Sequence, residues 1–321
     1  MKVSAIITTK NRTDLFKRAI KSIFSQTVRP EEIIVIEDGG DYSVENWIED
    51  NYHNDVIFFR QMNSQGLSSA RNKGLELAKH DLIAFLDDDD EWLPRRLEEQ
   101  LSFYKKLNDY EKENLACIQV GCNILNENNT LVSVALPVHF GNMKESIINF
   151  NGIVTHSSCF LFSRKALISV NGFDNILKSG IDHDIWMKLA VKNYISFSIK
   201  IPLVNVYIDS RETMMKNTNQ RLEGTDEFVK KWESTFIEWF DNSFPRRYYI
   251  LVISGLMGVK LSNFEIKDSI LIFKNLISKS RFNFKLNFFL FSRVFKVYLY
   301  HKHPYLRHLK RKLFKTNHVQ T

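Results

Sequence analysis

The last 53 residues of this 321-residue chain contain no aspartate or glutamate. Residues 269–321 hold twelve lysines and arginines, whereas residues 1–268 carry 32 basic and 37 acidic residues, a net charge of −5. A mildly acidic body is therefore joined to a basic tail, and basic tails bind nucleic acid or anionic membranes. Because this tail is also rich in Phe, Leu and Tyr, we expect an anionic membrane surface or a partner helix as its partner, and no nucleic acid.

Long hydrophobic runs and cysteines are also scarce. No apolar run reaches the roughly 18–20 residues that span a bilayer, and the longest near-candidate, Tyr248 to Val259, is too short. Val3 to Ile7 is followed at once by polar residues, which argues against a signal peptide. The three cysteines, Cys117, Cys122 and Cys159, lack zinc-site spacing and are expected to be buried thiols in a reducing cytosol.

Apolar runs of strand length alternate with helical patterns along the first half of the chain. The expected strands are Val3–Ile7, Ile33–Ile36, Val56–Phe59 and Leu82–Leu86, and then Ala116–Leu125, Thr130–Leu136 and Ser157–Phe162, with a last pair of short strands within Ile199–Tyr207. This alternation predicts an α/β fold, with helices on both faces of a largely parallel sheet.

The strand pattern stops after about Met215, and the rest of the chain has the pattern of several helices. We therefore expect a catalytic domain over residues 1–215, with halves of about 1–110 and 111–215. A basic, aromatic helical region should follow over residues 216–321. That region either lies at a membrane interface or packs as a helical bundle with a solvated basic rim.

Five consecutive acids, Asp87 to Glu91, directly follow the expected strand Leu82–Leu86. Adjacent carboxylates repel one another unless water or a cation compensates. At the end of a buried strand their oxygens are hard ligands suited to Mg²⁺ or Mn²⁺. The alternative is a solvated acidic turn before the next helix.

Polar clusters end three of the expected strands, at Thr8–Arg12, Glu37–Gly39 and Asp87–Asp90. Ligands of parallel α/β sheets bind beyond the carboxyl ends of the strands. If these strands are parallel, all three clusters open onto one edge. The pattern predicts a polar cleft for a base, a sugar and phosphates with a metal ion.

Five motifs in order resemble those of the family 2 glycosyltransferases, which have the GT-A fold. They are Ile6–Arg12, Ile36–Gly40, Asn63–Gly74, Leu86–Pro94 with its D-x-D acids, and Gly180–Ala190. The resemblance covers about residues 1–210 and implies a mixed sheet with helices on both faces. The chain departs from the family pattern at Glu37 (usually Asp), Ile181 (usually Glu) and Ser210 (often His).

The resemblance also implies roles for individual residues. The implied nucleotide-sugar-binding residues are Thr8, Arg12, Asp38, Arg71, Asp87 and Asp88. Thr8 and Arg12 would border the base, and Asp38 would accept the imide N–H of uracil. Arg71 would hold base or phosphate unless it forms only a surface ion pair, and Asp87 or Asp88 would bind the ribose. Asp89 would ligate the Mn²⁺ or Mg²⁺ that bridges the phosphates.

Asp182 is the implied general base for the acceptor hydroxyl, with Asp184 as second choice. The alternative is that both acids only stabilise the start of their helix. The implied reaction moves a sugar from a UDP-linked hexose or N-acetylhexosamine with inversion. The acceptor would be lipid-linked, for example through undecaprenyl diphosphate, in bacterial polysaccharide or O-antigen assembly. The protein would be cytoplasmic, peripheral at the inner face of the cell membrane.

Two other functions remain open at this stage. A phosphohydrolase with its acids after a strand usually has Thr or Val where Glu91 stands. A degenerate, non-catalytic transferase could bind a lipid-linked glycan or a partner through its basic tail. Ile181 and Ser210 motivate this last hypothesis.

Overall fold

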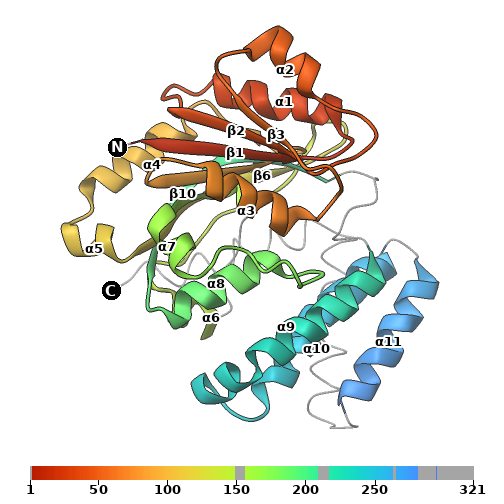
Figure 1. The fold of residues 1–321 in the computed structure, drawn as a ribbon. Helices are drawn as coiled ribbons and strands as arrows, with labels where there is room; N and C mark the ends of the chain where they lie inside the picture. The colour runs from red at the N-terminus through yellow and green to blue at the C-terminus, as the bar shows by residue number, and fades with distance from the viewer. Residues whose placement is uncertain (1, 149–155, 209–216, 263–264, 281–293, 295–321) are drawn as a thin grey trace. The chain divides into compact units, whose positions relative to one another are not determined.

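The computed structural model describes residues 2–148, 156–208, 217–262, 265–280 and 294. Contacts divide the chain into two compact units (Figure 1). One comprises Met1–Ile176 and Ile181–Ser210, and the other comprises Leu177–Gly180 and Arg211–Thr321. The boundary expected at residue 215 lies outside the described residues, as do Ser210 and most of the basic tail.

The first unit is built on a mixed sheet of ten strands within the described residues. Its path runs β3-β2-β1-β4-β9-β6-β10-β5, with β7 on β6 and β8 on β10. The strands are β1 (Val3–Thr9), β2 (Glu32–Glu37), β3 (Ile57–Arg60), β4 (Leu82–Asp87), β5 (Glu91–Trp92), β6 (Leu115–Asn126), β7 (Leu131–Ala135), β8 (Gly141–Asn142), β9 (Phe160–Ser163) and β10 (Ile195–Ile208). β1 to β4 run parallel, as do β6 and β10, whereas β9 is antiparallel to both β4 and β6.

The apolar runs form the centre of this sheet. Every residue of β1 and β2 is buried, as expected for strands covered on both faces. Two expectations were wrong in detail. Ser157–Cys159 form a 3₁₀ turn before β9. Ile199–Tyr207 belong to one strand of 14 residues instead of two short ones. That strand shifts register around Pro202, whose nitrogen has no hydrogen to donate.

Helices cover both faces of the sheet in the first unit. They are α1 (Thr13–Phe24), α2 (Glu45–Tyr52), α3 (Leu67–Leu77), α4 (Arg96–Lys106), α5 (Asp109–Glu113), α6 (Met143–Ile148), α7 (Arg164–Ser169) and α8 (Ile181–Val191). Figure 1 shows α1 and α2 over one face of β1 to β3 and α3 over the other. Cys117, Cys122 and Cys159 are all buried free thiols, as expected.

The second unit contains helices α9 (Thr218–Trp239), α10 (Phe244–Ser262) and α11 (Ile266–Ser280). Their shared core consists of Leu222, Tyr249, Ile250, Ile253, Ile272, Leu276 and Val294. The loop Leu177–Gly180 packs on α9, where Gln220 donates a hydrogen bond to the carbonyl of Lys178. Within the described part of the chain, no helix combines the length and apolar character needed to cross a bilayer.

Candidate active site

The three polar clusters meet at one edge of the sheet. β1 lies between β2 and β4, and all three strands are parallel. Thr9 pairs with Glu37 on one side, and buried Thr8 pairs with Asp87 on the other. The convergence predicted from the sequence is therefore confirmed, and it rests on strand order as much as on the clusters themselves.

Asp38 anchors the turn that precedes α3. Its carboxylate accepts hydrogen bonds from the Ser64 hydroxyl (2.8 Å) and from the backbone N–H groups of Gln65 (2.7 Å) and Gly66 (2.9 Å). A carboxylate has about four acceptor positions, so one remains for a ligand donor. Asp38 thus fixes the turn from Ser64 to Gly66 beside the end of β2.

Arg71 of α3 lies at the centre of the site and is almost completely buried, with 1% of its surface exposed. It donates to Asp87 (2.7 Å), to Asp182 (2.9 Å) and to the Ser157 hydroxyl (2.7 Å), and Ser157 in turn donates to Asp87 (2.8 Å). The alternative of a surface ion pair is therefore wrong. Arg71 joins the end of β4 to the start of α8, across 111 positions of sequence.

The same contacts set the ionisation of this cluster. Burial would lower the pKa of Arg71, but the carboxylates of Asp87 and Asp182 raise it above its ordinary value. Burial alone would likewise raise the pKa of Asp87, and the bonds from Arg71 and Ser157 lower it instead. Asp87 is accordingly held as a carboxylate beside a permanent positive charge.

Asp88 and Asp89 share a different arginine. The Arg12 guanidinium lies 3.0 Å from Asp88 and 2.9 Å from Asp89, and the Thr9 hydroxyl donates to Asp88 (2.8 Å). Burial, partly offset by Arg12 and reinforced by the charge of Asp89, raises the pKa of Asp88 to about 6. The side chain of Asp89 is 26% exposed, which makes it the more accessible carboxylate of this pair.

Two serines that sequence reasoning missed, Ser157 and Ser158, form hydrogen bonds with carboxylates of the acid run. Ser157 bonds Asp87, and the Ser158 hydroxyl donates to buried Asp90 (2.5 Å) while accepting from the Asp87 N–H (3.2 Å). Burial and the neighbouring acids raise the pKa of Asp90 well above its usual range. No local pattern marks these serines, because their partners lie about 70 positions earlier in the chain.

The two candidate bases on α8 differ in access. The Asp182 side chain is 39% exposed, whereas Asp184 is completely buried, with the Lys188 ammonium 3.4 Å from its carboxylate. A general base must reach the proton of a bound substrate. Asp182 is therefore the acid of the two that a substrate could reach, and Asp184 pairs with Lys188 inside the fold.

Asp89 is the residue here that could hold a divalent ion. In the described ranges, no three His, Cys, Asp or Glu side chains form a ready-made metal cluster. Mg²⁺ in phosphate chemistry is often held by one or two carboxylates together with substrate phosphates. The partly exposed carboxylate of Asp89, in the middle of the acid run, fits that mode of binding.

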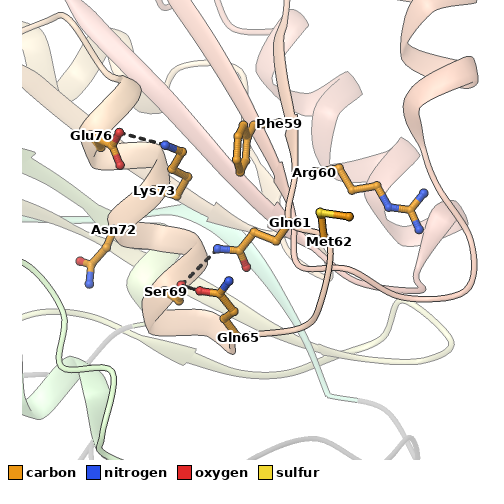
Figure 2. A pocket seen from close by; sticks show the side chains of 9 residues that line it. All are labelled: Phe59, Arg60, Gln61, Met62, Gln65, Ser69, Asn72, Lys73 and Glu76. Carbon is orange, nitrogen blue, oxygen red and sulfur yellow. Dashed lines mark hydrogen bonds and ion pairs between the residues drawn. The ribbon is translucent and has the colours of Figure 1, made fainter.

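A separate hollow of about 560 Å³ lies between β3 and α3. Figure 2 shows its lining, which comes from β3, the following loop and α3: Phe59, Arg60, Gln61, Met62, Gln65, Ser69, Asn72, Lys73 and Glu76. Its carboxylate, Glu76, is paired with Lys73 at 2.9 Å. None of the acids of the strand-end site lines this hollow, so it is distinct from that site.

Solved structures share this fold. The structure of S. aureus TarS 1–349 in complex with UDP-GlcNAc superposes with a TM-score of 0.61 at 15% identity, covering 96% of this chain and 92% of that one. TarS 1–349 without a named ligand gives a TM-score of 0.60 at 14% identity. At this identity the likeness is one of fold, and the fold is GT-A.

Curated relatives are also glycosyltransferases by name. A Rickettsia bellii protein is 28% identical over 223 residues, or 70% of this chain, but the match spans only 31% of that protein's length. A Rickettsia typhi protein is 26% identical over 72% of this chain and 70% of its own length. A Campylobacter jejuni GalNAc(5)-diNAcBac-PP-undecaprenol beta-1,3-glucosyltransferase is 37% identical over 95 residues, 29% of this chain and 31% of that protein.

The family model described as glycosyl transferase family 2 matches residues 4–170, just over half of the chain. That range contains Arg12 and Arg71 and the carboxylates paired with them, except for Asp182. This protein belongs to glycosyl transferase family 2 and is a glycosyltransferase with the GT-A fold.

Proposed function

We propose that this enzyme transfers a hexose or N-acetylhexosamine from a UDP-linked donor to a hydroxyl group of a saccharide acceptor, with inversion at the anomeric carbon. The observation that carries the proposal is the Arg71 bridge between Asp87 and Asp182. This bridge holds the accessible carboxylate of Asp182 next to the acid run Asp87–Glu91. If the donor diphosphate lies at that run, the general base for the acceptor hydroxyl must lie nearby. Members of one family share a fold and a reaction class, but the substrates depend on the site of each member.

The donor would lie along the edge from β2 to β4. Asp38 would accept the uracil imide N–H with its remaining acceptor position, beside Thr8. Arg12, which pairs with Asp88 and Asp89, would lie toward the diphosphate instead of bordering the base. Asp87 or Asp88 would bind the ribose hydroxyls, because carboxylates at the end of β4 face the same edge. The complex of TarS with UDP-GlcNAc supports a nucleotide-sugar donor by likeness of fold.

Asp182 would act on the acceptor. It takes the proton from the acceptor hydroxyl as that oxygen bonds to the anomeric carbon, and the bond from that carbon to the diphosphate oxygen breaks. Attack from the side opposite the leaving group inverts the anomeric centre. Asp89 would hold Mn²⁺ or Mg²⁺, which when bound neutralises charge on the departing diphosphate.

Calorimetry with UDP tests the donor. We expect UDP to bind at least about tenfold more tightly with Mn²⁺ than with EDTA, since the cation would join Asp89 to the diphosphate. ADP and GDP are the controls for the base. Absence of metal-dependent UDP binding would favour the non-catalytic alternative, and release of phosphate from p-nitrophenyl phosphate would favour the phosphohydrolase.

A lipid-linked acceptor is the second part of the proposal, in polysaccharide or O-antigen assembly at the inner face of the cell membrane. The Campylobacter jejuni relative is named for an undecaprenol-linked acceptor. Helix α11 supports a membrane contact, because Ile266, Ile270 and Phe273 are exposed at helical spacing. Lys267 and Lys274 are exposed on the same helix. Apolar side chains with flanking lysines suit an anionic interface.

Vesicle flotation tests this contact. We expect the full chain to float with phosphatidylglycerol vesicles, and the double substitution Ile270→Asp, Phe273→Asp to reduce the bound fraction at least about tenfold, because it places charge in the apolar stripe. Ile168→Asp, at an exposed position of α7, is the matched control. If the double variant and the control float equally well, α11 does not form the membrane contact.

A further inference from the structure

The side chain of Arg12 lies between the two acids that follow Asp87. A single nitrogen, Nη1, is 3.0 Å from Oδ1 of Asp88 and 2.9 Å from Oδ2 of Asp89. Oxygens of two neighbouring carboxylates that converge on one positive group form the arrangement that a hard divalent cation also uses. The guanidinium therefore stands where a cation ligated by Asp89 would have to approach.

Hydrogen bonds constrain the backbone at Arg12, whereas its side chain is partly exposed to solvent. Asn11 adopts a left-handed conformation (φ 54°), and its side-chain oxygen accepts from the Asp41 N–H (2.8 Å). The Arg12 carbonyl accepts from the Phe16 N–H (2.9 Å), which begins α1. The Arg12 side chain itself is 34% exposed. The backbone hydrogen bond of Arg12 is thus separate from the bonds that its partly exposed guanidinium makes to Asp88 and Asp89.

The acid run keeps its shape through contacts that do not involve Arg12. Arg18 donates to the carbonyl of Asp89, and its guanidinium stacks on the Tyr207 ring at 3.7 Å. The Asp90 N–H donates to the Asp87 carbonyl (3.0 Å). Loss of the Arg12 charge would therefore leave the backbone of the run in place, with the Thr9 hydroxyl still on Asp88 and less positive charge to compensate the two carboxylates.

We infer that Arg12 occupies the cation position until the nucleotide arrives, and so makes cation binding depend on the donor. Its positive charge repels a divalent ion and competes for the oxygens of Asp88 and Asp89. A diphosphate offers the guanidinium a matching pair of oxygens, which releases Asp89 to the cation. This inference rests on the proposed function, because it takes Asp89 as the cation ligand and a diphosphate as the donor group.

The affinity for Mn²⁺ in the absence of nucleotide is the quantity that should change most when the Arg12 charge is removed. We expect Arg12→Gln, which keeps a polar but shorter side chain and removes the charge, to bind Mn²⁺ alone about tenfold more tightly than the natural protein. The factor by which UDP strengthens Mn²⁺ binding should shrink in the variant. By linkage, the factor by which Mn²⁺ strengthens UDP binding shrinks equally.

Electron paramagnetic resonance of free Mn²⁺ measures both quantities on the full chain, with and without saturating UDP. Arg95→Gln is the matched control, because Arg95, whose side chain is exposed before the start of α4, also pairs with two neighbouring acids, Glu98 (3.3 Å) and Glu99 (2.5 Å). The combination Arg12→Gln, Asp89→Asn should abolish the gain in affinity. Circular dichroism melting establishes that each variant is folded.

Tighter Mn²⁺ binding in Arg12→Gln alone, lost again in the double variant, supports the inference. Unchanged or weaker Mn²⁺ binding in Arg12→Gln overturns it, and so does a gain that survives Asp89→Asn. The proposed donor fails by a different result, namely no metal-dependent UDP binding by the natural protein. Mn²⁺ binding by the Arg12 variants therefore tests the inference, and UDP binding by the natural protein separately tests the proposed donor.

Discussion

Replacing Asp182 by asparagine is expected to reduce sugar transfer by about 10²- to 10⁴-fold, the range for loss of a positioned general base. The asparagine oxygen can still accept the bond from Arg71 that Asp182 accepts at 2.9 Å. The variant should therefore fold and bind UDP as the natural protein does. The measurement is the transfer rate at saturating donor, beside UDP affinity by calorimetry.

Asp184→Asn is the matched control for this experiment. Both acids lie in the first turn of α8, but Asp184 is completely buried beside Lys188. Its substitution should lower the melting temperature and leave the transfer rate of folded enzyme within a few-fold of the natural value. A large loss of transfer in Asp184→Asn, with full activity in Asp182→Asn, would move the base role to Asp184.

Replacing Arg71 by methionine is expected to destabilise the first unit by about 3–5 kcal/mol, the range for removing one partner of a buried ion pair. Methionine fills part of the buried volume but leaves the partly exposed Asp87 carboxylate beside Ser157 without its positive partner. Urea denaturation of natural and variant protein measures the loss. Arg95→Met, at an exposed ion pair, should change stability by less than about 0.5 kcal/mol.

The Arg71 effect should depend on pH in a defined direction. Burial opposes ionisation of Asp87, and Arg71 outweighs it, so the folded-state pKa of Asp87 is lowered. A carboxyl group with a lowered pKa stabilises the fold above its unfolded pKa of about 3.9 and loses that contribution as the pH falls further. The stability difference between natural protein and Arg71→Met should therefore be largest at neutral pH and shrink below about pH 4. A difference that grows with acidity would contradict the assigned partnership.

Local sequence patterns determined much of this fold. The apolar runs at β1, β2 and β4 become strands buried on both faces, because short, largely apolar runs bounded by polar residues are typical of fully buried strands. The polar clusters that end these strands indicated the edge that carries the site. The ordered motifs indicated the family, and the family model confirms it.

The partners within the site were decided only by the tertiary structure. Arg71 and Asp182 are 111 positions apart, and Ser158 and Asp90 are 68 apart. Local periodicity carries no information on such pairs, because they form only when α3, the acids after β4, the turn before β9 and α8 come together in space. The two serines were missed for that reason.

The different environments of similar residues were likewise invisible in the sequence. Asp182 and Asp184 stand two positions apart in one motif, yet one is accessible and the other completely buried, since successive positions on a helix face different directions. Arg12 and Arg71 both belong to family-like motifs, yet one is partly exposed and the other enclosed. The sequence by itself determined which chemical groups reach the edge of the sheet. Packing decided which of them are paired, buried or open to substrate, because burial and charge pairing depend on neighbours that the fold brings together from distant parts of the chain.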